Sequence, residues 1–154
     1  PLQTAPVRSV APRRALPATV AISAPIAPPG RFLWPVEGQV VARFGAGQSG
    51  ERNDGINIAV PLGTPIRSTA DGTVAYVGDA ITSMGGLVIV KHGEGWTSVY
   101  GHASKLLVQR GQAVKKGQTL ALSGATGYAD RPEVHFELRR GRGPVDPLTQ
   151  LPRE

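Results

Sequence analysis

Hydrophobic residues in this chain fall into short runs, and from Arg31 onward glycines and polar residues separate these runs. The runs are rich in valine and isoleucine, and several alternate apolar with polar residues, which is the period of a β-strand. Seven runs have strand character: 40–44, 56–60, 73–77, 87–91, 97–100, 119–122 and 134–139. The one helical pattern is the tetrapeptide 104–107, which we expect to be a turn at most. The pattern predicts an all-β fold, an antiparallel sheet or sandwich.

Residues 1–30 differ in composition from the rest of the chain. They contain seven prolines, many alanines, three arginines and no acidic residue. A segment of this kind buries too little apolar surface to fold, and its prolines favour an extended chain. We therefore expect a disordered linker over residues 1–30 and one folded domain over residues 31–154.

The composition agrees with short strands joined by tight turns, since the chain has 20 glycines, 14 prolines and only 5% aromatic residues. It contains no cysteine, which excludes disulfides and thiolate-bound metal. A metal ion would therefore need His, Asp or Glu ligands. No apolar run approaches the roughly 20 residues that span a bilayer, so no transmembrane segment is expected in this sequence.

The chain carries a net charge of +6, which suits a soluble surface or an anionic partner. Its densest basic stretch is Arg139-Arg140-Gly141-Arg142, and no aromatic residue follows Phe136. Proteins that bind single-stranded nucleic acid interleave stacking aromatics with their basic residues. We therefore expect no nucleic-acid partner, since an anionic wall polymer or lipid headgroups would suit the charge at least as well as DNA.

Five short motifs occur in order along the predicted domain, and each alone is a weak signal. They are NDGINIA (53–59), PLGTPI (61–66), ADGTV (70–74), VYGH (99–102) and VHFE (134–137). KGQ (116–118), SGATG (123–127) and PVDP (144–147) accompany them. Together they resemble the LytM (lysostaphin-like) zinc endopeptidase family over roughly residues 32–147. The resemblance implies the antiparallel β-sandwich of that family, the duplicated hybrid motif.

The same resemblance implies that the zinc site has lost most of its ligands. Active members carry a His-x-Gly-x-Asp element and a His-x-His element, whose first His, Asp and last His bind zinc. In this chain Asn53 stands at the first His, Asn57 at the Asp, and Glu133 at the first His of His-x-His. His135 is the one remaining ligand, and His102 matches a separate histidine that assists the chemistry.

Catalytic zinc needs three protein ligands, and neutral amides are poor donors to a dication. We therefore expect no enzyme activity, no metal and no other cofactor. A rebuilt site remains an alternative, because Glu133 and His135 face the same side of one strand and His102 could be a third ligand. His92 lies outside the family's catalytic set, and we expect it to be an ordinary residue at the end of a strand.

Degenerate LytM domains of the EnvC, NlpD and DipM subgroup activate peptidoglycan hydrolases during cell division. The resemblance implies a non-catalytic activator of N-acetylmuramyl-L-alanine amidases or related hydrolases, located in the periplasm and recruited to the septum. The residues expected to bind the partner or peptidoglycan are the groove residues Asn53, Asn57, His102, Glu133 and His135. Two alternatives stay open: a passive peptidoglycan-binding module, and a zinc endopeptidase that uses Glu133, His135 and His102.

Overall fold

The computed structural model describes residues 31–47 and 52–153. It confirms the all-β prediction, and each of the seven predicted strands has a counterpart. The strands are β2 (Gln39–Ala42), β3 (Gly45–Ala46), β4 (Arg52–Asn53), β5 (Ile56–Ala59), β6 (Pro65–Arg67), β7 (Gly72–Gly78), β8 (Gly86–Lys91), β9 (Trp96–Leu106), β10 (Ala113–Val114), β11 (Thr119–Ser123), β12 (Glu133–Arg140) and β13 (Gly143–Val145). Two short 3-10 helices accompany them, η1 (Gly93–Gly95) and η2 (Pro147–Thr149). The predicted linker, residues 1–30, lies outside the described residues.

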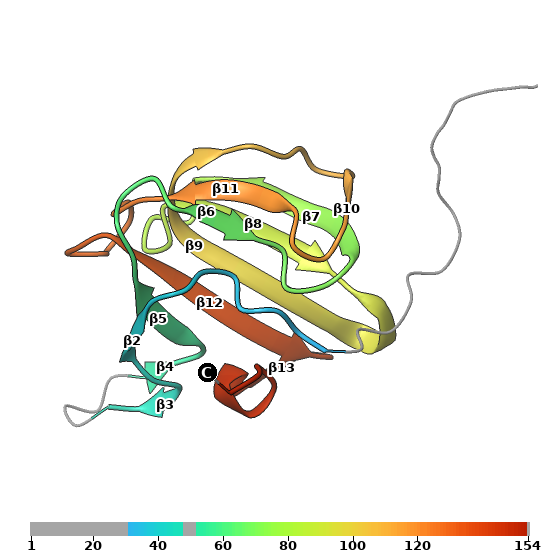
Figure 1. Cartoon of the computed structure of the whole chain (residues 1–154), viewed down its shortest axis with the longest axis horizontal. Helices are drawn as coiled ribbons and strands as arrows, with labels where there is room; N and C mark the ends of the chain where they lie inside the picture. Colours follow the sequence, from blue (N-terminus) through green and yellow to red (C-terminus); the bar gives the residue numbers. More distant parts are fainter. Residues whose placement is uncertain (1–30, 48–51, 154) are drawn as a thin grey trace, which may run out of the picture.

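The strands form one large antiparallel sheet in the order β10-β7-β8-β9-β12-β5-β2, and β3 pairs separately with β4. Strand β9 is the centre of the sheet, because it pairs with β8 on one side and with β12 on the other. Its last residues pair with β11, which pairs in turn with β6. β11 and β6 thus form a short second layer in front of β7 and β8, and the apolar core lies between the layers (Figure 1).

The segment 104–107, predicted to be a turn at most, continues strand β9 as far as Leu106. Two observations explain the difference. Lys105 pairs with Leu122 and Leu106 with Ala121, so β11 supplies the backbone partners that an isolated tetrapeptide lacks. Weak helix propensity is readily overridden by such tertiary pairing. β9 therefore extends over eleven residues and connects the two layers.

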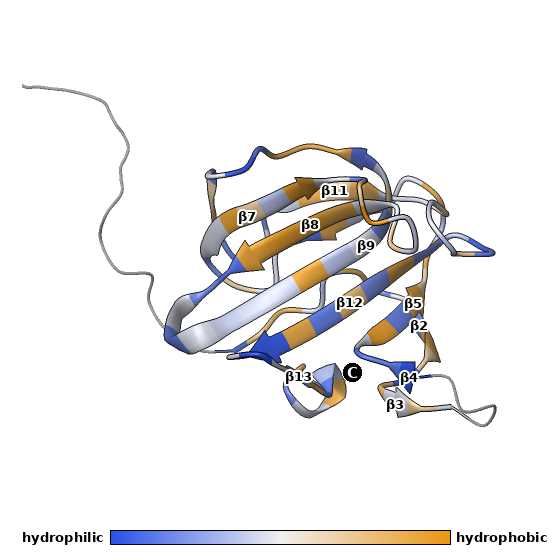
Figure 2. Cartoon of the chain, turned by 180° about the vertical axis from the view of Figure 1, so that it is seen from behind, coloured by the Kyte–Doolittle hydropathy of each residue, from blue (hydrophilic) through white to orange (hydrophobic). Residues whose placement is uncertain are grey.

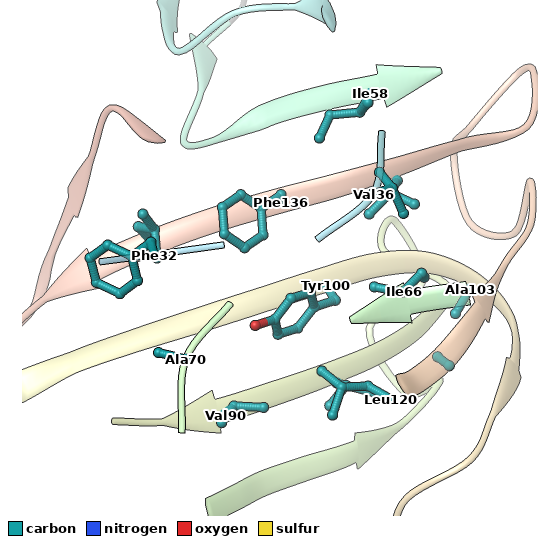
Figure 3. Packing of buried hydrophobic residues seen from close by; sticks show 14 of the residues in the cluster. Phe32, Val36, Ile58, Ile66, Ala70, Val90, Tyr100, Ala103, Leu120 and Phe136 are labelled. Atoms are coloured by element: carbon teal, nitrogen blue, oxygen red, sulfur yellow. The ribbon is translucent and has the colours of Figure 1, made fainter. Parts of the chain in front are cut away.

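Strand β12 presents two distinct faces. Its even-numbered residues Val134, Phe136 and Leu138 are fully buried and point into the core. Phe136 contacts Tyr100 of β9 with ring centroids 5.5 Å apart (Figure 3). Each such side chain stabilises the fold by about 1.5–3 kcal/mol relative to an exposed position. The odd-numbered residues are polar, so β12 alternates in hydropathy, whereas β8 is apolar almost throughout (Figure 2).

The segment before β2 closes the open edge of β6. Leu33 donates its backbone N–H to the carbonyl of Thr69, and Arg67 donates to the carbonyl of Pro35. Between this segment and the C-terminal Arg153 lies a groove of about 890 Å³. Its lining consists of residues 33–38, Thr64, Pro65, Arg67 and Arg153, and none of the predicted site residues belongs to it.

His92 directly follows β8, as expected for a strand-end residue, and it is also part of a buried hydrogen-bond chain. Its Nδ1 donates to the carbonyl of Asp71 (2.6 Å), and its Nε2 accepts from the hydroxyl of Ser98 (2.8 Å). Ser98 contacts the hydroxyl of Tyr100, which accepts from the backbone N–H of Thr69. Burial raises the pKa of Tyr100 to about 12. The chain satisfies polar groups inside the core, as buried polar groups require.

Among the described residues, no helix is long and apolar enough to cross a membrane.

Candidate functional site

The candidate site is a row of polar side chains on the outer face of β12. Successive strand residues alternate between faces, so Glu133, His135, Glu137 and Arg139 all lie opposite the core residues. Asn57 of β5 pairs directly with His135, which places its side chain in the same row. Glu133 and His135 are 8% exposed and Glu137 is 7% exposed. Burial to this degree requires that each polar group find a partner.

Asn57 is the centre of the site's hydrogen bonds. Its Nδ2 donates to Oε2 of Glu133 at 2.5 Å. Its Oδ1 accepts from Nδ2 of Asn53 at 3.0 Å and lies 3.2 Å from Nδ1 of His135. A carboxylate only accepts hydrogen bonds, so Glu133 fixes the orientation of the Asn57 amide. Three predicted site residues are thereby tied to the fourth, Asn57.

Asn53 reaches Asn57 because the turn between β4 and β5 is tight. Its Oδ1 accepts the backbone N–H of Gly55 at 3.1 Å, the local bond that asparagine commonly makes in turns. Gly55 lies against β12, and a Cβ at this position would be 2.1 Å from the carbonyl oxygen of Phe136. Glycine is therefore required for the turn to approach β12.

His135 is also held from its other side. Its Nε2 lies 2.8 Å from Oε2 of Glu137, and Glu137 accepts hydrogen bonds from Arg139 through Oε1. Burial alone would raise the pKa of Glu137, but the hydrogen bond from His135 and the charge of Arg139 outweigh it and lower that pKa. Both ring nitrogens of His135 face oxygen acceptors, Asn57 Oδ1 and Glu137 Oε2.

His102 stands beside this row on β9, with its ring centroid 6.1 Å from that of His135. Its Nδ1 donates to the carbonyl of Thr126 at 2.7 Å, which leaves Nε2 with its lone pair. Its φ of 67° is unusual for a residue other than glycine, and its backbone N–H is held by the carbonyl of Met84. Burial lowers the pKa of His102. Strained backbone of this kind is typical of functional sites.

The residues present do not fit a zinc ion. Zinc binds an imidazole through a free lone pair, and both ring nitrogens of His135 already lie within hydrogen-bond distance of oxygen atoms of the site. Asn57 places a neutral amide where the family has an anionic aspartate ligand, and that amide donates to Glu133. Glu133, His135 and His102 do lie together, as the rebuilt-site alternative requires. However, no three His, Asp or Glu side chains in the described ranges are arranged to hold a metal.

Sequence reasoning missed two members of the row, Glu137 and Arg139. The signal was available, because both share the odd-numbered face of β12 with Glu133 and His135. The structure also shows that Arg140 lies over Trp96, 5.3 Å from the ring centroid. The basic stretch thus has an aromatic contact from β9 that spacing along the sequence does not reveal. With Arg139 paired to Glu137, two of its three arginines are engaged within the fold.

Comparisons with known proteins agree with this geometry. The model of Peptidase family M23 matches residues 51–147. The chain is 45% identical over 130 residues to the cell division protein DipM of Caulobacter vibrioides, which covers 80% of this chain and 21% of DipM. It is 42% identical over 125 residues to the murein hydrolase activator NlpD of Escherichia coli, covering 81% of this chain and 32% of NlpD. The chain therefore spans well under half of either curated relative.

Two solved structures show the same fold. A zinc-containing peptidase from Vibrio cholerae superposes with a TM-score of 0.73 at 33% identity, covering 80% of this chain and 41% of that one. The catalytic domain of lysostaphin from Staphylococcus simulans gives a TM-score of 0.64 at 26% identity, covering 73% and 88%. The LytM-type resemblance is confirmed, since the family match extends over more than half of the sequence and includes the degenerate row. The chain belongs to peptidase family M23.

Proposed function

We propose that this domain is a non-catalytic regulator that activates cell-wall hydrolases. One observation carries the proposal: at the family's zinc position the side chains bind one another. Asn57 joins Glu133, Asn53 and His135 through hydrogen bonds, and Glu137 takes the remaining nitrogen of His135. A metallopeptidase needs an ion with an open coordination position for water. A fold that keeps this family's shape without that chemistry is suited to binding.

The names of the relatives support the same role. NlpD of Escherichia coli is named a murein hydrolase activator, and DipM of Caulobacter vibrioides a cell division protein. Fold alone does not establish function, so the role is transferred here as a proposal. More specifically, we propose that the partners are N-acetylmuramyl-L-alanine amidases. We also propose that the domain acts in the periplasm at the division septum.

The proposed binding surface is the degenerate site, defined as Asn53, Asn57, His102, Glu133 and His135, together with three loops around it. Each loop carries one exposed apolar side chain: Leu62 is 66% exposed, Ile81 47% and Tyr128 77%. Clustered exposed apolar residues beside polar groups are typical of protein-binding surfaces.

Backbone hydrogen bonds hold these loops around the site. Gly63 donates to the carbonyl of Ser123, and Tyr128 donates to the carbonyl of Ser83. Glu133 itself donates its backbone N–H to Gly124, at the start of the Tyr128 loop. The three apolar side chains therefore come from loops anchored to the same end of the sheet. A partner that contacts them would bind at the end of the sheet where β12 begins.

The test is release of dye from labelled peptidoglycan sacculi by the chain alone, by an amidase from the same genome alone, and by both together. We expect no release by the chain and faster release by the amidase when the chain is present. The Tyr128→Ser variant should reduce the stimulation several-fold. Leu107→Ser replaces another exposed apolar side chain, 44% exposed and outside the three loops, so it serves as the folded control and should stimulate normally.

Two outcomes would contradict the proposal. Release by the chain alone that a chelator abolishes would show an active metallopeptidase with an altered ligand set. Sedimentation of the chain with sacculi, without any effect on hydrolases, would show a passive peptidoglycan-binding module.

A further inference from the structure

Two polar atoms in the degenerate site have no partner. In the described part of the chain, no hydrogen bond ends on Oε1 of Glu133, whose other oxygen accepts from Asn57. Likewise Nε2 of His102 has no hydrogen bond there, while its Nδ1 donates to Thr126. Both residues are more than nine-tenths buried, with 8% of Glu133 and 6% of His102 exposed. A buried polar atom without a partner costs free energy and marks a place for a ligand.

Both free atoms are hydrogen-bond acceptors. The carboxylate of Glu133 only accepts, and its charge acts on the neighbouring His102 ring. The carbonyl of Thr126 can only accept, so it takes the proton on Nδ1 of His102 and leaves a lone pair on Nε2. An anionic oxygen beside a nitrogen lone pair is complementary to a group that only donates. Among protein side chains, the lysine ammonium, the arginine guanidinium and the tryptophan indole only donate, and the first two also carry the positive charge that complements Glu133.

The surroundings fit the rest of such a side chain. Only a small fraction of Glu133 and His102 is accessible, so a slender chain reaches them better than a flat surface does. The exposed Leu62, Ile81 and Tyr128 lie on the loops around the same strand ends. These apolar groups can pack on the methylene stem of a lysine or arginine, and Tyr128 can face its cation.

We propose that Glu133 and His102 receive the cationic end of a lysine or arginine side chain from the partner hydrolase. This inference rests on the proposed function and adds the chemistry of the contact. In this arrangement a cation donated by another protein occupies the region where zinc enzymes of the family hold their metal. The apolar loops favour a protein as the source over the free amine of a peptidoglycan stem peptide.

The test compares Glu133→Gln with Glu94→Gln in the full chain. At position 133 a glutamine can still accept from Asn57, but it then turns an N–H₂ donor toward the free position. Glu94 lies before β9, at the opposite end of β12 from Glu133, and receives the same chemical change. Thermal unfolding of both variants checks that they remain folded.

The first readout is affinity for the amidase. A lost charge-assisted hydrogen bond weakens binding by about tenfold or more. We expect that loss for Glu133→Gln and a change of less than about twofold for Glu94→Gln. Glu133→Asp, which keeps a carboxylate, should recover part of the affinity.

The second readout does not need the hydrolase. N-acetyl-lysine methylamide is titrated against the chain while the ring signals of His102 are followed by NMR, with N-acetyl-norleucine methylamide as the probe without a cation. We expect a saturable shift with the lysine probe only, absent in Glu133→Gln and retained in Glu94→Gln.

The two readouts separate the inference from the proposed function. If the amidase is activated but Glu133→Gln binds it as tightly as the wild type, the inference is wrong and the function stands. If the lysine probe binds but no hydrolase is activated, the proposed function is wrong. Loss of binding to sacculi alone in Glu133→Gln would identify the peptidoglycan amine as the source and overturn the assignment to a partner protein.

Discussion

Asn57 on β5 donates a hydrogen bond to Glu133 on β12, with 2.5 Å between Nδ2 and Oε2. The family resemblance implies a zinc-binding aspartate at the first position and a histidine that assists the chemistry at the second. Here one partner donates and the other accepts, so the two side chains attract each other directly. An amide that donates thus stands where the family's zinc enzymes carry an anionic ligand.

Asn57→Asp should destabilise the domain, because it replaces the donor to Glu133 by a second buried carboxylate. An unsatisfied buried acceptor costs about 1–3 kcal/mol. We expect a loss of about 2 kcal/mol or more in the free energy of unfolding, measured by urea denaturation. Gln39→Glu makes the same amide-to-acid change at an exposed position on β2 and should shift stability by less than about 0.5 kcal/mol. Equal stability of Asn57→Asp and wild type would contradict the role of this hydrogen bond.

Restoring the family's ligands should restore zinc binding. The triple variant Asn53→His, Asn57→Asp and Glu133→His places two imidazoles and a carboxylate around the position next to His135. We expect about one zinc per chain by metal analysis after dialysis. The single Asn57→Asp variant is the control and should bind none, since it leaves only one imidazole of the set. A triple variant that stays metal-free while folded would show that the Glu137 contact to His135 prevents coordination.

Glu137→Gln should destabilise the domain through the loss of a buried charge. The carboxylate contacts His135 at 2.8 Å and Arg139 at 2.8 Å, and only 7% of the residue is exposed. Removing one partner of such a network leaves the others uncompensated, which costs about 2–3 kcal/mol here because Arg139 is partly solvated. Asp130→Asn removes an acidic group that is 87% exposed and paired only with Arg131, and its effect on chemical denaturation should be near zero. Similar values for the two variants would contradict a structural role for the buried network.

The stability of the domain should fall as the pH is lowered from 7.5 to 5.5. Burial lowers the pKa of His92 below its ordinary 6.5, against a smaller opposing effect from its hydrogen bond to Asp71. The unfolded chain then takes up a proton near pH 6.5 while the folded chain does not, so acidification favours unfolding. The pKa of His102 is also lowered, so this histidine likewise makes acidification favour unfolding. The ordinary pKa of a glutamate is 4.5 and that of Glu137 in the folded chain is lower, so protonation of Glu137 affects stability below this pH range.

Denaturation curves at both pH values check this prediction. His92→Gln removes one of the two histidines whose pKa is lowered. It should reduce the dependence of stability on pH, even though it lowers stability at pH 7.5. A wild-type chain that is equally stable at both values, or more stable at pH 5.5, would contradict the assigned direction.

Much of the fold was predictable because its determinants are local. The pattern of apolar and polar residues located all seven predicted strands. The segment 104–107 was misjudged because its backbone partners lie in β11, which is distant in sequence. The hydrogen bonds of His92 could not be predicted for the same reason, since Asp71 and Ser98 approach it only in the folded sheet.

The sequence by itself determined which residue types stand at the zinc position, and ligand chemistry then argued against a metal. Only the tertiary structure decided what these residues do instead. The pairing of β5 with β12 brings Asn57 opposite His135, and the pleat aligns Glu133, His135 and Glu137 on one face. The strength of a hydrogen bond depends on its angle and on a donor–acceptor distance that varies by only a few tenths of an ångström. Strand register and side-chain packing set this geometry, and no single segment specifies them. In the folded chain they leave one acceptor atom free on Glu133 and one on His102.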